Sequence, residues 1–272
     1  MMSNIQRPNR VRELLKQGKM VYGCRSFTTH PAFIEIMGWT GFDFVSIDTE
    51  HSPADAGATL PGIQACEVSG TTPLVRIYEI NPPLICKVLD NGARGVMVPH
   101  VSTASQAEEV VRSVKFPPLG ERSACPLTRA AQYGLHSLSS LKEYYQKANE
   151  DTLVILSIEG VEGIKNTPEI LKVKGIDIIG LGVGDLSHSM GIPGETYDNP
   201  KLYGALKDMV KMCSEVGIPV MTPMYQYSSS KASETTYAKK IADAGVKVIY
   251  LGSDLSLFGR ACQELIKIRE VL

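Results

Sequence analysis

The sequence repeats one pattern along almost its whole length: a short apolar run is followed by a longer segment with helical spacing. The apolar runs are continuous, as expected for strands of a parallel sheet that is covered on both faces. Eight such units predict a single (β/α)8 barrel, an α/β fold whose usual size of about 250 residues fits one domain over residues 1–272. The predicted strands are 20–23, 42–48, 73–77, 95–98, 153–156, 176–180, 218–222 and 246–251.

Helical spacing between these runs predicts the covering layer of the barrel. In the connection before the sixth run, Thr167 is placed as the N-cap and Pro168 as the first helical residue. No regular period covers residues 116–133, and a loop of that length in a compact fold is usually functional. We expect a further loop over 228–234. The predicted helices are 10–17, 31–37, 58–68, 83–89, 104–114, 141–148, 168–173, 200–216, 235–244 and 255–271.

Composition excludes several classes of function. A formal net charge of −1 gives no basic surface for nucleic acid or for an anionic membrane. The N-terminal residues are polar, and no apolar stretch approaches the roughly 20 residues that span a bilayer. Six scattered cysteines without Cys-x-x-Cys spacing indicate reduced thiols. We therefore expect a cytoplasmic protein.

Two acids follow consecutive predicted strands. Glu159 comes directly after the fifth strand, and Asp185 lies in the Gly182-Val-Gly184-Asp185 turn after the sixth. Because parallel neighbours end at the same edge of a sheet, these carboxylates can share one hard cation. The alternative is that they are solvated or cap helices. The glycines of this turn also let the backbone come close to a ligand. A helix that begins at Leu186 would point the backbone amides of Gly184 and Asp185 at a substrate carboxylate.

More polar side chains are expected at the same end of the barrel, where active sites of this fold lie. Two acids, a histidine and an arginine suit metal-assisted chemistry on an anionic oxo compound. His51 would then move protons, and Arg76 would stabilise an enolate. Alternatively His51 is structural, and Arg76 pairs with an acid. The residues at this rim are Asp48, Glu50, His51, Arg76, Glu159, Asp185, Ser253 and Asp254.

At this point the residues match a known family: the chain resembles the HpcH/HpaI aldolases, metal-dependent class II pyruvate aldolases. The resemblance covers nearly the whole chain and rests on an ordered set of motifs. The closing Gly252-Ser-Asp-Leu255 is similar to the branch that acts on 2-oxo acids derived from sugar acids. The other motifs are Gly41-Phe-Asp-Phe-Val, Ile47-Asp-Thr-Glu-His51, Pro73-Leu-Val-Arg76, Leu89-Asp-Asn-Gly-Ala93, Val98-Pro99, Pro117-Pro-Leu-Gly-Glu-Arg122, Ile158-Glu159, Gly184-Asp-Leu-Ser187 and Met190-Gly191.

The resemblance implies reversible cleavage of a 4-hydroxy-2-oxo acid to pyruvate and an aldehyde. It implies Mg²⁺ or Mn²⁺, with Co²⁺ as a further candidate, on Glu159 and Asp185. Arg76 would hold the keto or enolate oxygen. The amides of Gly184 and Asp185 would hold the pyruvate carboxylate. His51, paired with Asp90, would act through a water as the acid and base. Spacing alone makes Asp90 a helix-end residue at the opposite rim. The resemblance also implies hexamers of paired dimers that exchange the last helix.

Three departures concern specificity. Ser157 stands where the family usually has Gln, so we expect it near the metal acids and the substrate. Gly182-Val-Gly184-Asp185 replaces Gly-Pro-Ala-Asp, and Ser123 follows Gly120-Glu-Arg122 where the family has Gly. The somewhat longer loop that follows, within residues 119–140, is expected to shape the aldehyde end of the site.

Other functions stay open on the sequence. An oxaloacetate-type decarboxylase or a lyase of CoA thioesters such as malyl-CoA would use the same enolate. A non-catalytic 2-oxo acid-binding protein would have less need of His51. Schiff-base chemistry lacks a lysine at a strand tip, since Lys247 stands at the start of its strand.

Overall fold

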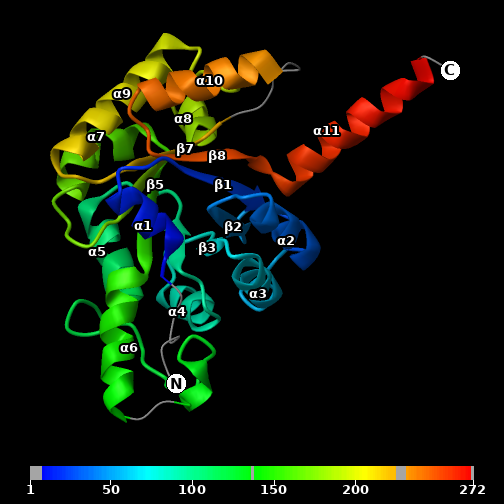
Figure 1. Ribbon diagram of the computed structural model, residues 1–272. Coiled ribbons are helices and arrows are strands. Elements are labelled where there is room, and N and C mark those ends of the chain that lie inside the picture. Colours follow the sequence, from blue (N-terminus) through cyan, green and yellow to red (C-terminus); the bar gives the residue numbers. More distant parts are fainter. Residues whose placement is uncertain (1–7, 136–137, 225–230, 271–272) are drawn as a thin grey trace.

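The computed structural model describes residues 8–135, 138–224 and 231–270. Eight parallel strands close into a barrel in sequence order, with β1 paired to both β2 and β8 (Figure 1). This arrangement confirms the predicted (β/α)8 fold. The strands are β1 (Val21–Ser26), β2 (Phe44–Asp48), β3 (Thr72–Arg76), β4 (Gly95–Val98), β5 (Leu153–Ile158), β6 (Ile178–Leu181), β7 (Val220–Pro223) and β8 (Val248–Ser253).

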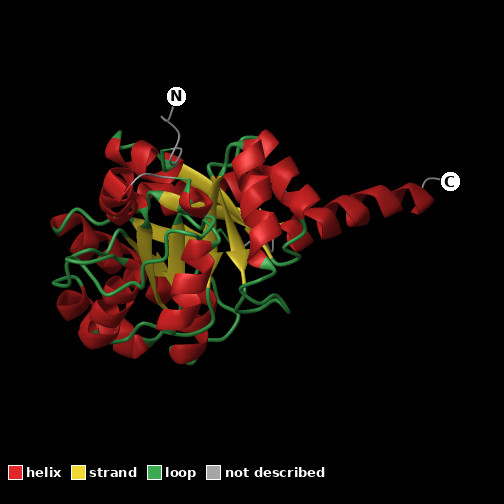
Figure 2. Cartoon of the chain, turned by 90° about the horizontal axis from the view of Figure 1, so that it is seen from below, coloured by secondary structure: helices red, strands yellow, loops and turns green. Residues whose placement is uncertain are grey.

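Helices surround the barrel (Figure 2). Three of them, α2, α4 and α9, begin with a proline, whose fixed φ suits the first helical turn. The helices are α1 (Arg10–Lys16), α2 (Pro31–Trp39), α3 (Thr59–Ser69), α4 (Pro82–Asp90), α5 (Ala104–Val114), α6 (Leu138–Asp151), α7 (Val161–Ile170), α8 (Val183–Ser189), α9 (Pro200–Glu215), α10 (Lys231–Asp243) and α11 (Asp254–Ile266), with short 3₁₀ segments η1 (Gln132–Gly134) and η2 (Lys267–Glu270).

Two apolar layers hold the barrel together. Side chains such as Phe44, Leu74 and Ile155 fill its interior, whereas residues such as Val45 and Ile47 pack outward against the helices. Since successive side chains of a strand point to opposite faces, every second residue points inward. On β2 the inward side chains are Phe44, Ser46 and Asp48, so this alternation brings polar side chains inside the barrel toward the strand end.

Some predicted boundaries are wrong, for local reasons. β1 runs to Ser26 instead of ending at residue 23, because Arg25 and Ser26 continue the pairing with β2. α7 begins at Val161, so Pro168 lies in its last turns and Thr167 bonds the carbonyl of Gly163 as an interior residue.

Two later helices, α8 and α10, also begin earlier than predicted. α8 begins at Val183, not at residue 186, with Gly182 as its N-cap. α10 begins at Lys231. The predicted loop over 228–234 is therefore wrong from residue 231 onward, and its first residues lie outside the described part of the chain.

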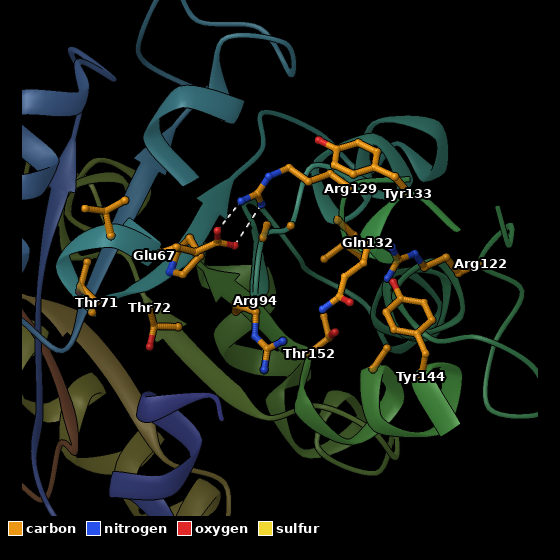
Figure 3. Close-up of a pocket in the computed structure, with 18 of the residues that line it drawn as sticks. Glu67, Thr71, Thr72, Arg94, Arg122, Arg129, Gln132, Tyr133, Tyr144 and Thr152 are labelled. Carbon is orange, nitrogen blue, oxygen red and sulfur yellow. Dashed lines mark hydrogen bonds and ion pairs between the residues drawn. The ribbon is translucent and has the colours of Figure 1, made fainter. Parts of the chain in front are cut away.

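The long loop after α5 lies at the N-terminal end of the barrel. Arg122 donates to Asp90 at the end of α4 (2.8 Å), and Arg129 donates to Glu67 in α3 (3.0 Å). Beside it is a cavity of about 700 Å³, which also reaches Thr72 and Thr152 at the starts of β3 and β5 (Figure 3). Within one chain, the loop is therefore remote from the strand tips that carry the predicted site, and it does not shape the aldehyde end there.

The last helix leaves the barrel. α11 projects away from the body of the molecule with its C-terminal half free of the barrel (Figures 1 and 2). Its start is fixed by Asp254, and Phe258 meets Phe33 of α2 edge to face. Apolar side chains on α11 and on η2, including Leu265, Ile266 and Ile268, are more than half exposed. Exchange of this helix between subunits stays a prediction.

Among the described helices, none is both long enough and apolar enough to cross a membrane.

Candidate active site

Arg76 is the centre of a buried ion-pair network at the C-terminal end of the barrel. Its Nε donates to Asp48 Oδ2 at 2.6 Å, its Nη2 contacts the same oxygen, and its Nη1 lies 2.8 Å from Glu50 Oε2. The register pairs Asp48 with Arg76 directly across β2 and β3. The other oxygen of Asp48 accepts the amides of Glu50 and His51, at 3.1 and 2.7 Å. Arg76 therefore pairs with nearby acids, and this pairing fixes its guanidinium, while its contact with an enolate stays a prediction.

Glu159 is buried and held from two sides. The hydroxyl of Ser157 donates to Oε1 at 2.9 Å, and the backbone amide of His100 donates to Oε2 at 3.2 Å. Gly182 leaves room for this carboxylate, because a Cβ at that position would lie 2.4 Å from Oε1. Ser157 thus touches the predicted metal acid, while its predicted contact with substrate stays a prediction.

His100 is a site residue that the sequence reasoning missed. Its Nδ1 lies 3.2 Å from Glu159 Oε2, and its Nε2 lies 3.2 Å from Glu50 Oε1. Donor atoms of Glu50, His100 and Glu159 all lie within 4.8 Å of one another, close enough for one metal ion. The available signal was its position directly after β4 and Pro99, at the same barrel end as the other candidates.

Asp185 and Glu159 line the same small cavity, and a cation shared between them stays a prediction. Gly184 and Asp185 are the second and third residues of α8. Amides in a first helical turn have no acceptor inside their own helix. The turn can therefore offer the Gly184 and Asp185 amides to an anion, although its contact with a carboxylate stays a prediction.

His51 lines the cavity from the loop after β2, and its Nε2 lies 3.9 Å from Glu50 Oε2. Asp90 ends α4, as its spacing indicated, and its carboxylate accepts from Arg122. Among the described residues of one chain, His51 and Asp90 form no ion pair. Their pairing stays a prediction.

The two polar residues after β8 have structural roles. Ser253 caps α11 through its hydroxyl and the amide of Ser256. Asp254 is buried and accepts hydrogen bonds from the Ser26 hydroxyl and from the amides of Phe27 and Thr28. It therefore fastens the end of β1 and is already fully committed.

The cavity itself has a volume of about 170 Å³ and closes on β1 and β8 opposite the two acids. Arg25 and Tyr250 line this side, with the Arg25 guanidinium carbon 4.8 Å from the centre of the Tyr250 ring. Sequence reasoning missed Arg25 because it ended β1 at residue 23.

Burial dominates the electrostatics of this site. It raises the pKa of the Glu50 carboxyl, and the Arg76 guanidinium opposes that shift. The carboxylate of Glu159 acts in the same direction as burial. Burial and the charge of Glu159 therefore disfavour the ionised form of Glu50, whereas the Arg76 guanidinium favours it.

Comparison with known proteins gives a consistent result. A family model described as HpcH/HpaI aldolase/citrate lyase matches residues 22–260. The 5-keto-4-deoxy-D-glucarate aldolase of Escherichia coli O6:H1 is 29% identical, over 97% of this chain and 98% of that one. A namesake from Shigella boydii serotype 18 is 29% identical over 95% of each chain.

Solved structures agree with these relatives. A family protein from Burkholderia cenocepacia J2315 superimposes with a TM-score of 0.85 at 27% identity, over 96% of this chain and 99% of that one. The citrate synthase SbnG superimposes with a TM-score of 0.79 at 29% identity, over 95% and 96% of the two chains. Since the family model spans most of the barrel, this chain belongs to the HpcH/HpaI aldolase/citrate lyase family.

Proposed function

We propose that the protein is a divalent-metal-dependent aldolase, a carbon–carbon lyase that reversibly cleaves a 4-hydroxy-2-oxo acid to pyruvate and an aldehyde. The observation that carries this proposal is the shared cavity of Glu159, Asp185 and Arg76 at the C-terminal end of the barrel. The aldolase names of full-length relatives support the same chemistry.

The residues present fit a divalent cation. Two carboxylates at neighbouring strand tips are hard oxygen ligands of the kind that Mg²⁺ and Mn²⁺ take, with Co²⁺ as a further candidate. Gly182 has no Cβ, and the space where one would stand is filled by the carboxylate of Glu159. Such a cation supplies a Lewis acid that stabilises negative charge on the keto oxygen of the substrate.

The chain's own groups supply the remaining roles. Arg76 is held by Asp48 and Glu50, so it can donate to the developing enolate oxygen without first reorganising. The amides of Gly184 and Asp185 would hold the pyruvate carboxylate. His51 is more than half exposed beside Glu50, where it can exchange protons with a water at the substrate.

We propose that the enzyme is a cytoplasmic homo-oligomer of exchanged dimers, assembled as a hexamer. All six cysteines are free, which suits a reducing compartment. The projecting α11 has apolar side chains that its own barrel leaves exposed, and a second copy of the barrel would cover them.

The experiment that tests the function is hydrogen–deuterium exchange of the pyruvate methyl group in D₂O, followed by NMR. EDTA-treated protein should be inactive, and Mg²⁺ or Mn²⁺ should restore exchange. Glu159→Gln and Asp185→Asn should each lose metal-dependent exchange.

The matched controls are Glu162→Gln and Asp208→Asn on exposed helix positions, which should behave as the unmodified protein. Absence of exchange with any divalent metal would reject pyruvate as the nucleophile. A CoA-thioester lyase, an oxaloacetate-type decarboxylase or a 2-oxo acid-binding protein would then be tested in its place.

A further inference from the structure

Two buried hydroxyl groups join the ends of β6 and β7 beside the candidate active site. The hydroxyl of Thr222 on β7 donates to the carbonyl of Leu181, the last residue of β6, at 3.0 Å. The hydroxyl oxygens of Tyr197 and Thr222 lie 2.6 Å apart. Because Thr222 gives its one hydroxyl proton to Leu181, Tyr197 is the donor in this second contact. Both residues are fully buried.

A proline explains why the sheet takes a hydroxyl at this point. β6 and β7 are parallel, with Gly180 beside Met221. The evenly spaced bonds of such a ladder would next give the carbonyl of Leu181 the backbone amide of residue 223. That residue is Pro223, which has no N–H. The Thr222 hydroxyl therefore supplies the donor that the backbone lacks.

The carbonyl of Leu181 stands directly before the turn that carries Asp185. Gly182 follows it as the N-cap of α8, and Asp185 is the third residue of that helix. A buried carbonyl without a donor is costly, so the chain would shift here if the hydroxyl were lost. The hydroxyl pair therefore fixes the start of α8 relative to Glu159, whose carboxylate fills the space beside Gly182.

Tyr197 is itself held from the helical layer. It lies in the connection between α8 and α9, and its backbone amide donates to the hydroxyl of Tyr237 on α10 at 3.1 Å. The two rings stack with their centres 6.4 Å apart. A continuous set of contacts therefore runs from α10 through Tyr197 and Thr222 to the start of α8.

We propose that Tyr197 and Thr222 are positioning residues of the metal site. Their hydroxyl groups hold the Leu181 carbonyl and so keep the Asp185 carboxylate in place beside Glu159. Both hydroxyls are spent on these contacts, so they act through Asp185. This inference rests on the proposed aldolase function and assigns to it two residues that carry none of its chemistry.

The test measures the binding of Mn²⁺ to the metal-free protein by electron paramagnetic resonance, without substrate. Thr222→Val removes the hydroxyl and keeps the shape of the side chain, and it should raise the Kd for Mn²⁺ about tenfold. Tyr197→Phe leaves the bond from Thr222 to Leu181 in place and should raise the Kd by roughly threefold. Thr222→Ser keeps the donor and should bind Mn²⁺ as the unmodified protein does.

Thr167→Val is the matched control. This buried threonine also donates its hydroxyl to a carbonyl, that of Gly163 within α7, and it does not line the cavity. Thr167→Val should lower the melting temperature, as Thr222→Val does, and leave the Kd for Mn²⁺ unchanged.

Asp185→Asn separates the inference from the function on which it rests. If this variant binds Mn²⁺ as tightly as the unmodified protein, the proposed metal site is rejected and the inference with it. If Asp185→Asn loses affinity while Thr222→Val and Tyr197→Phe keep it, the hydroxyl pair is only structural and the inference alone is overturned. Equal losses in Thr222→Ser and Thr222→Val also overturn it, because the hydroxyl is then not the cause. Tyr197→Phe decides alone where Thr222→Val does not fold.

Discussion

Glu159 is positioned by two hydrogen-bond donors and by a glycine. The Ser157 hydroxyl and the His100 amide each take one of its oxygens, and Gly182 leaves the space that the carboxylate occupies. Mutating the hydrogen-bond partner of a metal ligand typically lowers the affinity for the metal about 10–100-fold.

Gly182→Ala should therefore weaken metal binding about tenfold or more. The new methyl group would lie 2.4 Å from Glu159 Oε1 and force the carboxylate to move. Backbone conformation is no obstacle, because φ at Gly182 is −82°. Titration with Mn²⁺ measures the effect. Gly204→Ala in α9 is the control, since no atom lies within 4 Å of the added Cβ. Equal metal affinity in both variants would mean that Glu159 is not a ligand.

A second prediction for a single residue concerns the buried thiol of Cys24. Burial, assisted by the charge of Asp254, raises its pKa from 9.0 to about 12. The folded protein therefore keeps this proton at pH 10.5, whereas the unfolded chain has released it. Stability from this group is complete below pH 9 and is lost as the pH rises toward 12.

Thiolate absorbance near 240 nm measures whether the Cys24 thiol is ionised. At pH 10.5, native unmodified protein and native Cys24→Ala should absorb equally. In urea at the same pH, the unmodified protein should show one additional thiolate. A difference already present in the native state would contradict the burial of Cys24.

Individual residues were predictable to different degrees. Glu159, Asp185 and Arg76 end apolar runs, so their position followed from the strand pattern, and the structure brings them to one cavity. His100 follows a proline with a left-handed backbone (φ 56°), a conformation that no sequence pattern here indicated. Arg25 interrupts an apolar run, so it looked like the end of a strand that in fact continues.

Among the elements, β1 depends most on a distant partner. Its end is tied to Asp254 at the first position of α11 by contacts to Ser26, Phe27 and Thr28. This tie explains how polar residues remain in strand geometry at the rim. It also explains why the sequence alone placed the boundary wrongly, because the stabilising group lies more than 200 residues away.

Asp254→Ala should destabilise the fold by roughly 3 kcal/mol, because it leaves several donors at the end of β1 without an acceptor. Thermal unfolding should show this loss, and Asp243→Ala, at an exposed residue at the end of α10, should not. A metal-binding role for Asp254 predicts the reverse: little change in stability and a loss of metal affinity.

Other element boundaries failed for similar reasons. Pro168 has the φ of a helix start but is tolerated late in α7, where the helix is about to end. The polar segment before Thr235 offered no apolar period, yet α10 already begins at Lys231. Strand existence and order were predictable because each strand is a continuous apolar run, whereas helix ends depend on caps and tertiary contacts.

The molecule as a whole is asymmetric, with a closed barrel and one helix outside it (Figure 2). Leu265 is 68% exposed and Ile268 is 52% exposed on this helix and the short 3₁₀ segment that follows. Isolated chains rarely leave such a row of apolar side chains in water.

Replacing Leu265 and Ile268 together by Glu should shift the assembly toward monomers, because two charges would be buried in the exchanged contact. Light scattering after size-exclusion chromatography measures the mass. Lys267→Glu, a charge reversal on the same segment, is the control and should keep the native mass. A double variant of unchanged mass would exclude a helix-mediated assembly.

Asp254 joins the projecting helix α11 to β1, the strand that carries Arg25. One carboxylate therefore both begins the helix and holds the end of the strand. Where α11 docks, its first turn holds the end of β1 in place, and the wall of the cavity forms with it. These contacts form within one chain, so each barrel closes this wall with its own helix. A force applied to the projecting part of α11 would therefore reach the cavity wall through a single carboxylate.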